Sequence, residues 1–330
     1  MKFLFYSDLH LDEPHLEVCE QVLDEIMGVA LDIGVDYTIN GGDTFHKRGI
    51  IKTKLFSALY NKRKRWADEG IKNIDIIGNH DQADAAGLIH PMKVFEQFDG
   101  WRVIDKPWSV PELDMTFVPY RKNYDGIMFH GDTVIHAGIC GAYLNDKKQD
   151  EDGIPAQDFN SAKKVFAGHY HRRQKIGKNI HYIGSPYQQN FGERDQSKGV
   201  LYYNQTTGKV TFIEIKGTPK YYYVNVSFKD DKAKKMKVDL SDGVVKGDRL
   251  KVFVKGTIEQ SSMVTRAGLQ VKFPDQSIEI DRDIQEESYS RLNVDEDEGV
   301  EGLFEKYVDF VEPDLDKGKL MGVFKEIAAI

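Results

Sequence analysis

Cysteine, positive net charge and long apolar runs are all scarce in this chain of 330 residues. Cys19 and Cys140 are its only cysteines, which excludes a disulfide framework and favours a reducing compartment. The apolar start, Phe3 to Tyr6, meets Ser7 and Asp8 too early for a signal peptide, and no stretch is long enough to span a membrane. We therefore expect a cytoplasmic protein with no membrane partner.

Acidic residues outnumber basic ones, with 53 Asp and Glu residues against 45 Lys and Arg residues, which gives a net charge of −8. This balance counts against a chain that grips nucleic acid strongly without help. Hydrophobic residues make up 40% of the chain, which suffices for one large domain and a small one.

Five short segments rich in Asp, Asn and His each follow an apolar run that predicts a β-strand. They read Asp8-Leu9-His10, Gly42-Asp43-Thr44-Phe45-His46, Gly78-Asn79-His80-Asp81, His136-Ala137-Gly138 and Gly168-His169-Tyr170-His171, and they contain six of the ten histidines. The strands are predicted at residues 3–6, 37–39, 74–77, 133–135 and 165–167. Because strand ends converge on one edge of an α/β sheet, we expect the five segments to meet there.

Each segment alone has an ordinary explanation: an N-cap or turn for the first, a turn for the third, and a hydrogen-bonded histidine for His136. Together they form a coherent ligand set. Carboxylate and amide oxygens mixed with imidazoles suit Mn, Fe or Zn, and the absence of thiolates argues against a structural zinc site. Two such ions about 3.5–4 Å apart are a standard device for in-line attack on a phosphate ester. The sequence therefore predicts a phosphoesterase.

These motifs resemble the calcineurin-like metallophosphoesterase superfamily over roughly residues 1–215. Within it, the second motif ends in His46 and the third in Asp81, as in the SbcD-type nuclease subunit of the double-strand-break repair complex. The loop Gly184 to Glu193 is similar to the one that follows the last metal motif in these nucleases. The compact length is closer to the phage recombination endonuclease subunit, which implies a bacterial or phage-infected cell.

The resemblance implies a fold, a ligand set and cofactors. The fold is a four-layer α/β/β/α sandwich with a small α+β capping domain and a C-terminal helical partner-binding segment. The cofactors are two Mn²⁺ ions, with Mg²⁺, Fe²⁺ or Zn²⁺ as substitutes. The implied ligands are Asp8, His10 and His171 for one ion, Asn79, His136 and His169 for the other, and Asp43 as the bridge.

Three further residues are expected to take part in catalysis. His80 is expected to bind the phosphate and to protonate or stabilise the leaving 3′ oxygen. Asp81 would orient His80 through its carboxylate. His46 would contact DNA or position its end, and the alternative is a structural histidine that supports the metal site.

Two basic clusters could offset the acidic balance. Lys62 to Arg65 lies in a predicted helix, where a solvated helix face is the favoured interpretation. Arg172, Arg173 and Lys175 follow the last metal motif, and we expect them to contact DNA phosphates, together with Tyr187 from the next loop. Weak DNA binding by the chain alone is still expected, so a partner must supply much of the affinity.

We expect four parts in the chain: a nuclease domain at residues 1–218, a capping domain at 219–284, an acidic linker at 285–298 and a helical segment at 299–330. Within the capping domain, a short helix is predicted near 262–269 and a strand around 270–280. In the last segment, Leu303, Phe304, Tyr307 and Val308 recur at helical spacing. The resemblance implies that they bind an SMC-like ATPase, and the alternative is that these helices pack on their own chain. The family resemblance also implies a homodimer.

The leading interpretation is thus a metal-dependent DNA nuclease that processes DNA ends in recombination and repair. It would act as a 3′–5′ exonuclease on duplex ends and as an endonuclease on single strands, by two-metal in-line hydrolysis. One alternative is a stand-alone phosphodiesterase or phosphatase for small substrates. Another is a scaffold that mainly tethers DNA ends for its ATPase.

Overall fold

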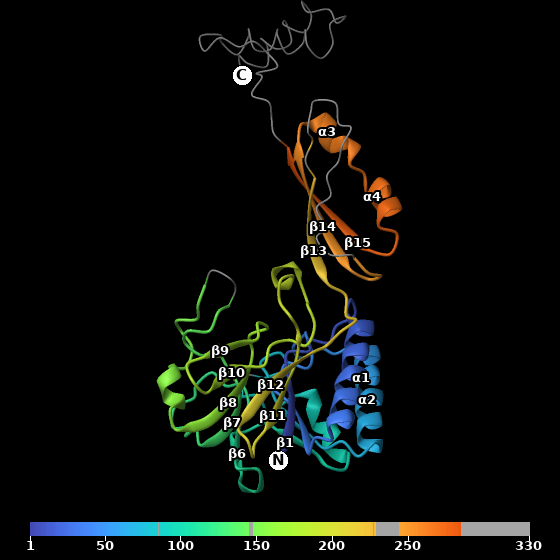
Figure 1. Cartoon of the computed structure of the whole chain (residues 1–330). Coiled ribbons are helices and arrows are strands. Elements are labelled where there is room, and N and C mark those ends of the chain that lie inside the picture. Colours follow the sequence, from blue (N-terminus) through green and yellow to red (C-terminus); the bar gives the residue numbers. More distant parts are fainter. Residues whose placement is uncertain (85, 145–147, 227, 229–243, 285–330) are drawn as a thin grey trace, which may run out of the picture. The chain divides into compact units, whose positions relative to one another are not determined.

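A computed structural model describes residues 1–84, 86–144, 148–226, 228 and 244–284 (Figure 1). The predicted acidic linker and the helical segment with Leu303, Phe304, Tyr307 and Val308 lie outside the described residues, so both stay predictions. Two compact units are distinguished within the chain. The larger comprises Met1–Tyr222, Val244–Leu250 and Asp275–Ser277, and the described part of the smaller contains most of the small third sheet.

The larger unit is built on two six-stranded sheets. The first has the order β12-β11-β1-β2-β3-β4, with β1 at Lys2–Tyr6, β2 at Tyr37–Asn40, β3 at Asn73–Ile76, β4 at Trp101–Ile104, β11 at Gly199–Asn204 and β12 at Lys209–Glu214. The second has the order β5-β6-β7-β8-β10-β9, with β5 at Trp108–Val110, β6 at Met115–Val118, β7 at Gly131–His136, β8 at Ala162–Gly168, β9 at Gln174–Ile176 and β10 at Ile180–Tyr182. This mixed α/β architecture confirms the predicted fold class.

The two sheets pack face to face through an aromatic and aliphatic core. Phe5 of β1 stacks on Phe166 of β8 with ring centroids 4.0 Å apart. Buried residues from both sheets surround this pair: Phe3, Ile39, Ile74, Ile76, Phe117, Val134 and Leu201. Because strands of the first sheet carry apolar side chains on both faces, they read as continuous apolar runs in the sequence.

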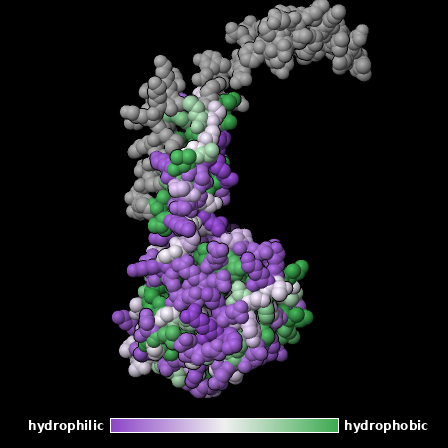
Figure 2. Space-filling model, turned by 90° about the vertical axis from the view of Figure 1, so that its right-hand side faces the viewer, coloured by the Kyte–Doolittle hydropathy of each residue, from purple (hydrophilic) through white to green (hydrophobic). Residues whose placement is uncertain are grey.

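Two long helices, α1 (Leu16–Ile33) and α2 (Thr53–Asp68), cover the other face of the first sheet (Figure 1). The buried side of α1 recurs at intervals of three or four residues, through Cys19, Val22, Ile26 and Ala30. Gly34 ends the helix in the left-handed conformation, where it donates its N–H to the carbonyl of Ala30. The side of the unit seen in Figure 2 is mostly hydrophilic, as expected for the outward faces of such helices.

The outer face of the second sheet is covered by loops and short 3₁₀ turns. Phe129 and Phe159 pack there with ring centroids 4.4 Å apart. The 3₁₀ turns of the unit are η1 at Pro91–Gln97, η2 at Pro111–Leu113, η3 at Ala156–Phe159 and η4 at Phe191–Glu193. In the described part of the chain, no helix has the length and apolarity that crossing a bilayer requires.

The small third sheet has the order β13-β14-β15, with strands Tyr221–Val226, Arg249–Gly256 and Ser277–Ile284. Helices α3 (Ile258–Met263) and α4 (Arg266–Lys272) lie between β14 and β15 in sequence. The predicted strand at 270–280 begins later than expected, because α4 continues to Lys272. Thr265 caps that helix by accepting the N–H of Gly268, a local signal that favours the helix.

The parallel strands determine where the motifs lie. β1, β2, β3 and β4 run parallel in the first sheet, and β6, β7 and β8 run parallel in the second. The first three motifs therefore leave the carboxyl edge of one sheet, and the last two leave that of the other. The pattern of residues alone was interpreted as one converging sheet edge, whereas the family resemblance implied the two stacked sheets that the structure has. Periodicity in the sequence cannot distinguish one sheet from two stacked ones.

A buried ion pair lies behind the second and third motifs. Arg63 of α2 donates to both carboxylate oxygens of Asp75 on β3, at 2.6 and 2.9 Å, and both side chains are essentially inaccessible to solvent. Asp75 also accepts the side-chain amide of Asn40, which donates to Thr44 in the second motif. The pair thus ties helix α2 to the strand ends that carry the motifs.

We predict that Asp75→Ala lowers the free energy of unfolding by about 3–5 kcal/mol, because it leaves the buried Arg63 guanidinium without a counter-charge. Urea denaturation measures the change. The matched control is Asp68→Ala, which removes an exposed partner of Lys64 on the same helix and should change stability far less. Equal losses in the two variants would contradict a supporting role for the buried pair.

Candidate metal centre

The first two motifs are joined to each other beyond the ends of their strands. The backbone N–H of Asp8 donates to the carbonyl of Gly42 at 2.9 Å, and that of His10 donates to the carbonyl of Asp43 at 3.0 Å. The fifth motif joins them, since the N–H of His169 donates to the Asp8 carboxylate at 3.0 Å. The motifs are thus held together by the backbone as well as by side chains.

The backbone is strained where the ligands are expected. Among the described non-glycine residues, five have a positive φ, and four of these are predicted metal ligands: Asp8, His10, Asp43 and His169. Left-handed backbone is costly for residues with a Cβ and persists where surrounding structure imposes it. Such clustering is typical of functional sites.

Two glycines permit the close approach of the second and third motifs. A Cβ on Gly42, whose φ is +100°, would lie 2.5 Å from the His136 ring. A Cβ on Gly78 would lie 2.2 Å from the Asp43 carboxylate. The Gly-Asp and Gly-Asn pairs in these motifs therefore have a steric reason.

One ligand group forms where Asp8, His10 and His171 meet, with their ligand atoms within 4.8 Å of one another. The Nε2 atoms of His10 and His171 are 3.0 Å apart. Two imidazole nitrogens at this distance repel each other unless a proton or a cation lies between them.

A second group forms where Asp43, His136 and His169 meet, again within 4.8 Å. Asn79 lies among them, with its carbonyl oxygen 3.0 Å from His136 Nε2 and 2.9 Å from His169 Nδ1. The structure thus brings all seven predicted ligands into two adjacent groups.

Asp43 lies between the two groups. One of its oxygens accepts the backbone N–H of His80 at 2.7 Å. The other is 3.6 Å from His10 Nε2 in the first group and 3.4 Å from His136 Nε2 in the second. A carboxylate in this position suits the bridging role implied by the family resemblance.

The donor set fits divalent cations on the evidence of its own protonation chemistry. Burial lowers the pKa of His10 to about 3 and that of His169 to about 4, so both rings are neutral and present lone pairs. His136 donates from Nδ1 to the carbonyl of Gly41, yet its Nε2 faces two acceptors, Asn79 and Asp43. Burial opposes charge on His136, but Asp43 raises its pKa to about 9. A proton satisfies that arrangement in the metal-free chain, and a cation would replace it.

His80 and His46 lie beside the first group. His80 donates from Nδ1 to the backbone carbonyl of His46 at 2.6 Å, and its ring centroid is 4.7 Å from that of His10. The His46 side chain is exposed, which favours a contact with substrate over a buried structural role. His10, His46 and His80 also bring their ring nitrogens within 4.8 Å of one another.

Asp81 has a different role from the one predicted. Its carboxylate accepts the backbone N–H groups of Thr44, Phe45 and Gly78 at 2.9, 3.1 and 3.1 Å. The expectation that Asp81 orients His80 is wrong, because the carbonyl of His46 holds the His80 ring. Asp81 therefore holds the second motif against the third.

The expected contact of Tyr187 with DNA is also wrong. Its side chain is only 1% exposed, and its hydroxyl donates to the carbonyl of Leu9 at 3.2 Å. Arg173 and Lys175 are exposed and Arg172 is partly exposed, so all three stay candidates for phosphate contacts. The Arg173 guanidinium lies over the ring of Phe212, 4.1 Å from its centroid.

Glu193 is a residue whose role the sequence did not reveal. One of its carboxylate oxygens is 2.8 Å from His171 Nδ1, and the other is 2.8 Å from the ammonium of Lys198. Burial opposes the charge on Glu193, but His171 and Lys198 lower its pKa to about 2. The only hint of this role in the sequence is that an acidic residue ends the loop that follows the last predicted metal motif.

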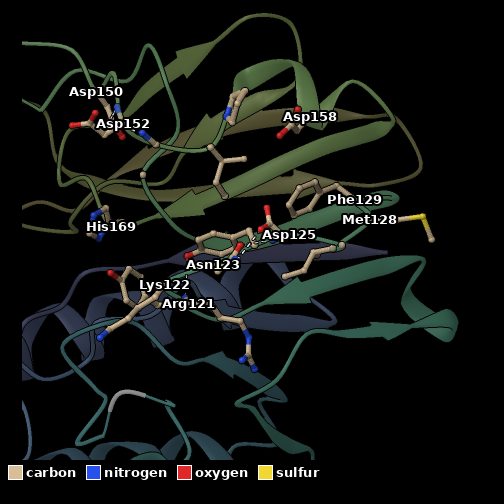
Figure 3. Close-up of a pocket in the computed structure, with 18 of the residues that line it drawn as sticks. Arg121, Lys122, Asn123, Asp125, Met128, Phe129, Asp150, Asp152, Asp158 and His169 are labelled. Atoms are coloured by element: carbon tan, nitrogen blue, oxygen red, sulfur yellow. Dashed lines mark hydrogen bonds between the residues drawn. The ribbon is translucent and has the colours of Figure 1, made fainter.

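A cavity of about 860 Å³ opens beside the second group and reaches His169 (Figure 3). Tyr120, whose ring stacks on His169, and Tyr170 form part of its wall. Arg121 and Lys122 line one side, and Asp150 and Asp152 lie across from them (Figure 3). The cavity thus combines aromatic walls with polar groups of both signs, which is common in sites for small polar ligands.

We predict that Mn²⁺ affinity rises with pH between pH 7 and about 9. His136 is protonated below its raised pKa, so the ion that binds with Asn79, His136 and His169 must displace that proton, at a cost of about tenfold in affinity per pH unit. Isothermal titration calorimetry in two buffers of different ionisation enthalpy counts the released proton at pH 7. An affinity that does not change over this range would contradict the assignment of His136.

Comparisons with known proteins agree with this geometry. The calcineurin-like phosphoesterase family matches residues 1–202. The chain is 26% identical over 194 residues to exonuclease subunit 1 of Enterobacteria phage T4, covering 54% of this chain and 56% of that protein. It is 24% identical over 287 residues to 244L of Invertebrate iridescent virus 6, described as a phosphoesterase, covering 78% and 95%.

A third relative is the SbcD component of nuclease SbcCD from Escherichia coli (strain K12), 32% identical over 114 residues, covering 30% of this chain and 28% of that protein. The chain thus spans only about half of the phage relative and less of the bacterial one. Phosphoesterases of the matched family use divalent metals, and the described residues contain groups able to hold them. With the family match covering well over half of its length, the chain belongs to the calcineurin-like phosphoesterases.

Proposed function

We propose that this phosphoesterase is a DNA nuclease that uses two divalent ions, with Mn²⁺ as the expected metal. The observation that carries the proposal is the meeting of the seven predicted ligands in two adjacent groups, with Asp43 between the groups and the His80 ring beside them. When bound, two such ions lower the pKa of water and neutralise charge on a phosphate. The products would be those of in-line hydrolysis of a phosphodiester.

His80 is proposed as the group that protonates or stabilises the leaving oxygen. Its Nδ1 is occupied by the carbonyl of His46, which leaves Nε2 for the substrate. The same hydrogen bond fixes the ring plane, so that a proton on Nε2 has a defined direction. His46, exposed next to it, would contact the strand end.

DNA is proposed as the substrate because two of the relatives are named as subunits of an exonuclease and a nuclease. Exposed Arg173 and Lys175 follow the last metal motif and offer charge for phosphates. The proposed polarity is 3′–5′ on duplex ends, with endonuclease activity on single strands. The role in DNA repair belongs to the same proposal.

The partners are proposed on the same grounds. The two relatives are subunits by name, and the net charge of −8 predicts weak DNA binding by this chain alone. We propose an SMC-like ATPase as the partner, bound through Leu303, Phe304, Tyr307 and Val308, and a homodimer of the chain itself.

A phosphodiesterase for small substrates is the second candidate. The cavity next to His169 favours it, since aspartates outnumber the basic Arg121 and Lys122 on its wall, which suits a small ligand better than a polyanion. The relative from Invertebrate iridescent virus 6, 95% of which this chain covers, is described only as a phosphoesterase.

Hydrolysis with Mn²⁺ separates the two candidates. We expect the chain to degrade end-labelled duplex and single-stranded DNA with a higher kcat/KM than bis(p-nitrophenyl) phosphate. The His80→Ser variant should lose about 10²- to 10⁴-fold in DNA turnover, as a lost proton donor typically costs, while retaining its bound metal.

Metal content of each variant is measured alongside activity. A chain that hydrolyses the small diester but leaves DNA intact would establish the second candidate instead. Loss of metal in parallel with activity in His80→Ser would make His80 a ligand.

A further inference from the structure

Three of the four predicted imidazole ligands differ in the partner of the ring nitrogen that faces away from the metal position. His171 has a carboxylate there, with Glu193 Oε1 2.8 Å from its Nδ1. His136 has a backbone carbonyl, that of Gly41, 2.7 Å from its Nδ1. The Nδ1 of His10 is buried without a hydrogen-bond partner among the described residues. The two ligand groups are therefore unequal.

The second carboxylate oxygen of Glu193 also has polar partners. That oxygen is 2.8 Å from the Lys198 ammonium and accepts the backbone N–H of Gln189 at 3.1 Å. Lys198 also donates to the hydroxyl of Ser185 and to the carbonyl of His171, each at 2.8 Å. Glu193 and Lys198 are 8% and 4% exposed, so solvent cannot substitute for either.

This network determines which nitrogen of His171 can act as a ligand. With Nδ1–H donating to Glu193, the lone pair of the neutral ring lies on Nε2. That atom lies 3.0 Å from His10 Nε2, in the group with Asp8. A carboxylate behind a ligating histidine also makes the ring a stronger ligand than a carbonyl does.

We propose that Glu193, fixed by Lys198, is a positioning residue that makes binding of one of the two ions dependent on it. The dependent position is that of Asp8, His10 and His171, whereas the position of Asn79, His136 and His169 is independent of Glu193. The inference rests on the ligand assignment of the proposed function. A role for Glu193 only in the overall stability of the chain would affect both ions or neither.

The test is a Mn²⁺ titration of the full chain and of Glu193→Gln, followed by calorimetry and electron paramagnetic resonance. Gln keeps the size and one acceptor oxygen but removes the charge that pairs with Lys198 and polarises His171. We expect two ions in the wild type. In the variant, affinity for one ion should fall about 10- to 100-fold while the other is unchanged. At intermediate Mn²⁺, the spectrum should change from a coupled pair to an isolated ion.

Two further variants make the result specific. Asp195 lies two residues after Glu193, and its side chain is 77% exposed and paired with Arg194. The Asp195→Asn variant should therefore bind both ions as the wild type does. Glu193→Asp keeps the charge near Lys198 but withdraws it from His171, so it should show the same selective loss. It also serves as the test if Glu193→Gln does not fold.

Equal weakening of both ions, or no weakening, in a folded Glu193 variant would overturn the role of Glu193 while leaving the nuclease proposal standing. A wild-type chain that binds fewer than two ions would overturn both. Recovery of the coupled spectrum in Glu193→Gln only at higher Mn²⁺ would support the inference.

Discussion

Electron-rich atoms that face one another at close range are the constraint on which this structure depends. His10 and His171 present ring nitrogens to each other at 3.0 Å, and His136 presents Nε2 to two acceptors. Such an arrangement is unfavourable in isolation and becomes favourable around a cation. The fold meets this cost with rigid supports: left-handed backbone at four predicted ligands, glycines where loops approach, and the carboxylate of Asp81, which accepts three backbone N–H groups.

The supports extend from the ligands into the core, and they differ between the two halves of the centre. Behind the second and third motifs, Asn40 connects Thr44 to the buried pair of Asp75 and Arg63. Behind the fifth motif, charged Glu193 and Lys198 replace neutral partners. Ligands held this way keep their geometry when substrate arrives, which is how preorganised sites contribute to catalysis.

The motifs could be predicted from the sequence because each ligand follows an apolar run directly. The strands at β1, β2, β3, β7 and β8 occur where those runs lie, and all seven predicted ligands meet. Long-range pairing could not be predicted. Nothing in the local sequence of Asp81 distinguishes a carboxylate that binds three distant N–H groups from one that orients His80. Tyr187 looked like a surface residue in a polar loop, yet its side chain is buried against Leu9 and Cys19. The two stacked sheets were implied by the family resemblance, because periodicity in the local sequence does not show to which sheet a strand belongs.

The proposed chemistry requires that these donors hold two divalent ions around Asp43, which metal analysis of the purified full chain can measure. Inductively coupled plasma mass spectrometry after Mn²⁺ loading and gel filtration should give two ions per wild-type chain. Asp43→Ala, which removes the carboxylate that faces both groups, should give close to none. Two ions per chain in a folded Asp43→Ala variant would show that Asp43 does not hold the pair of ions together.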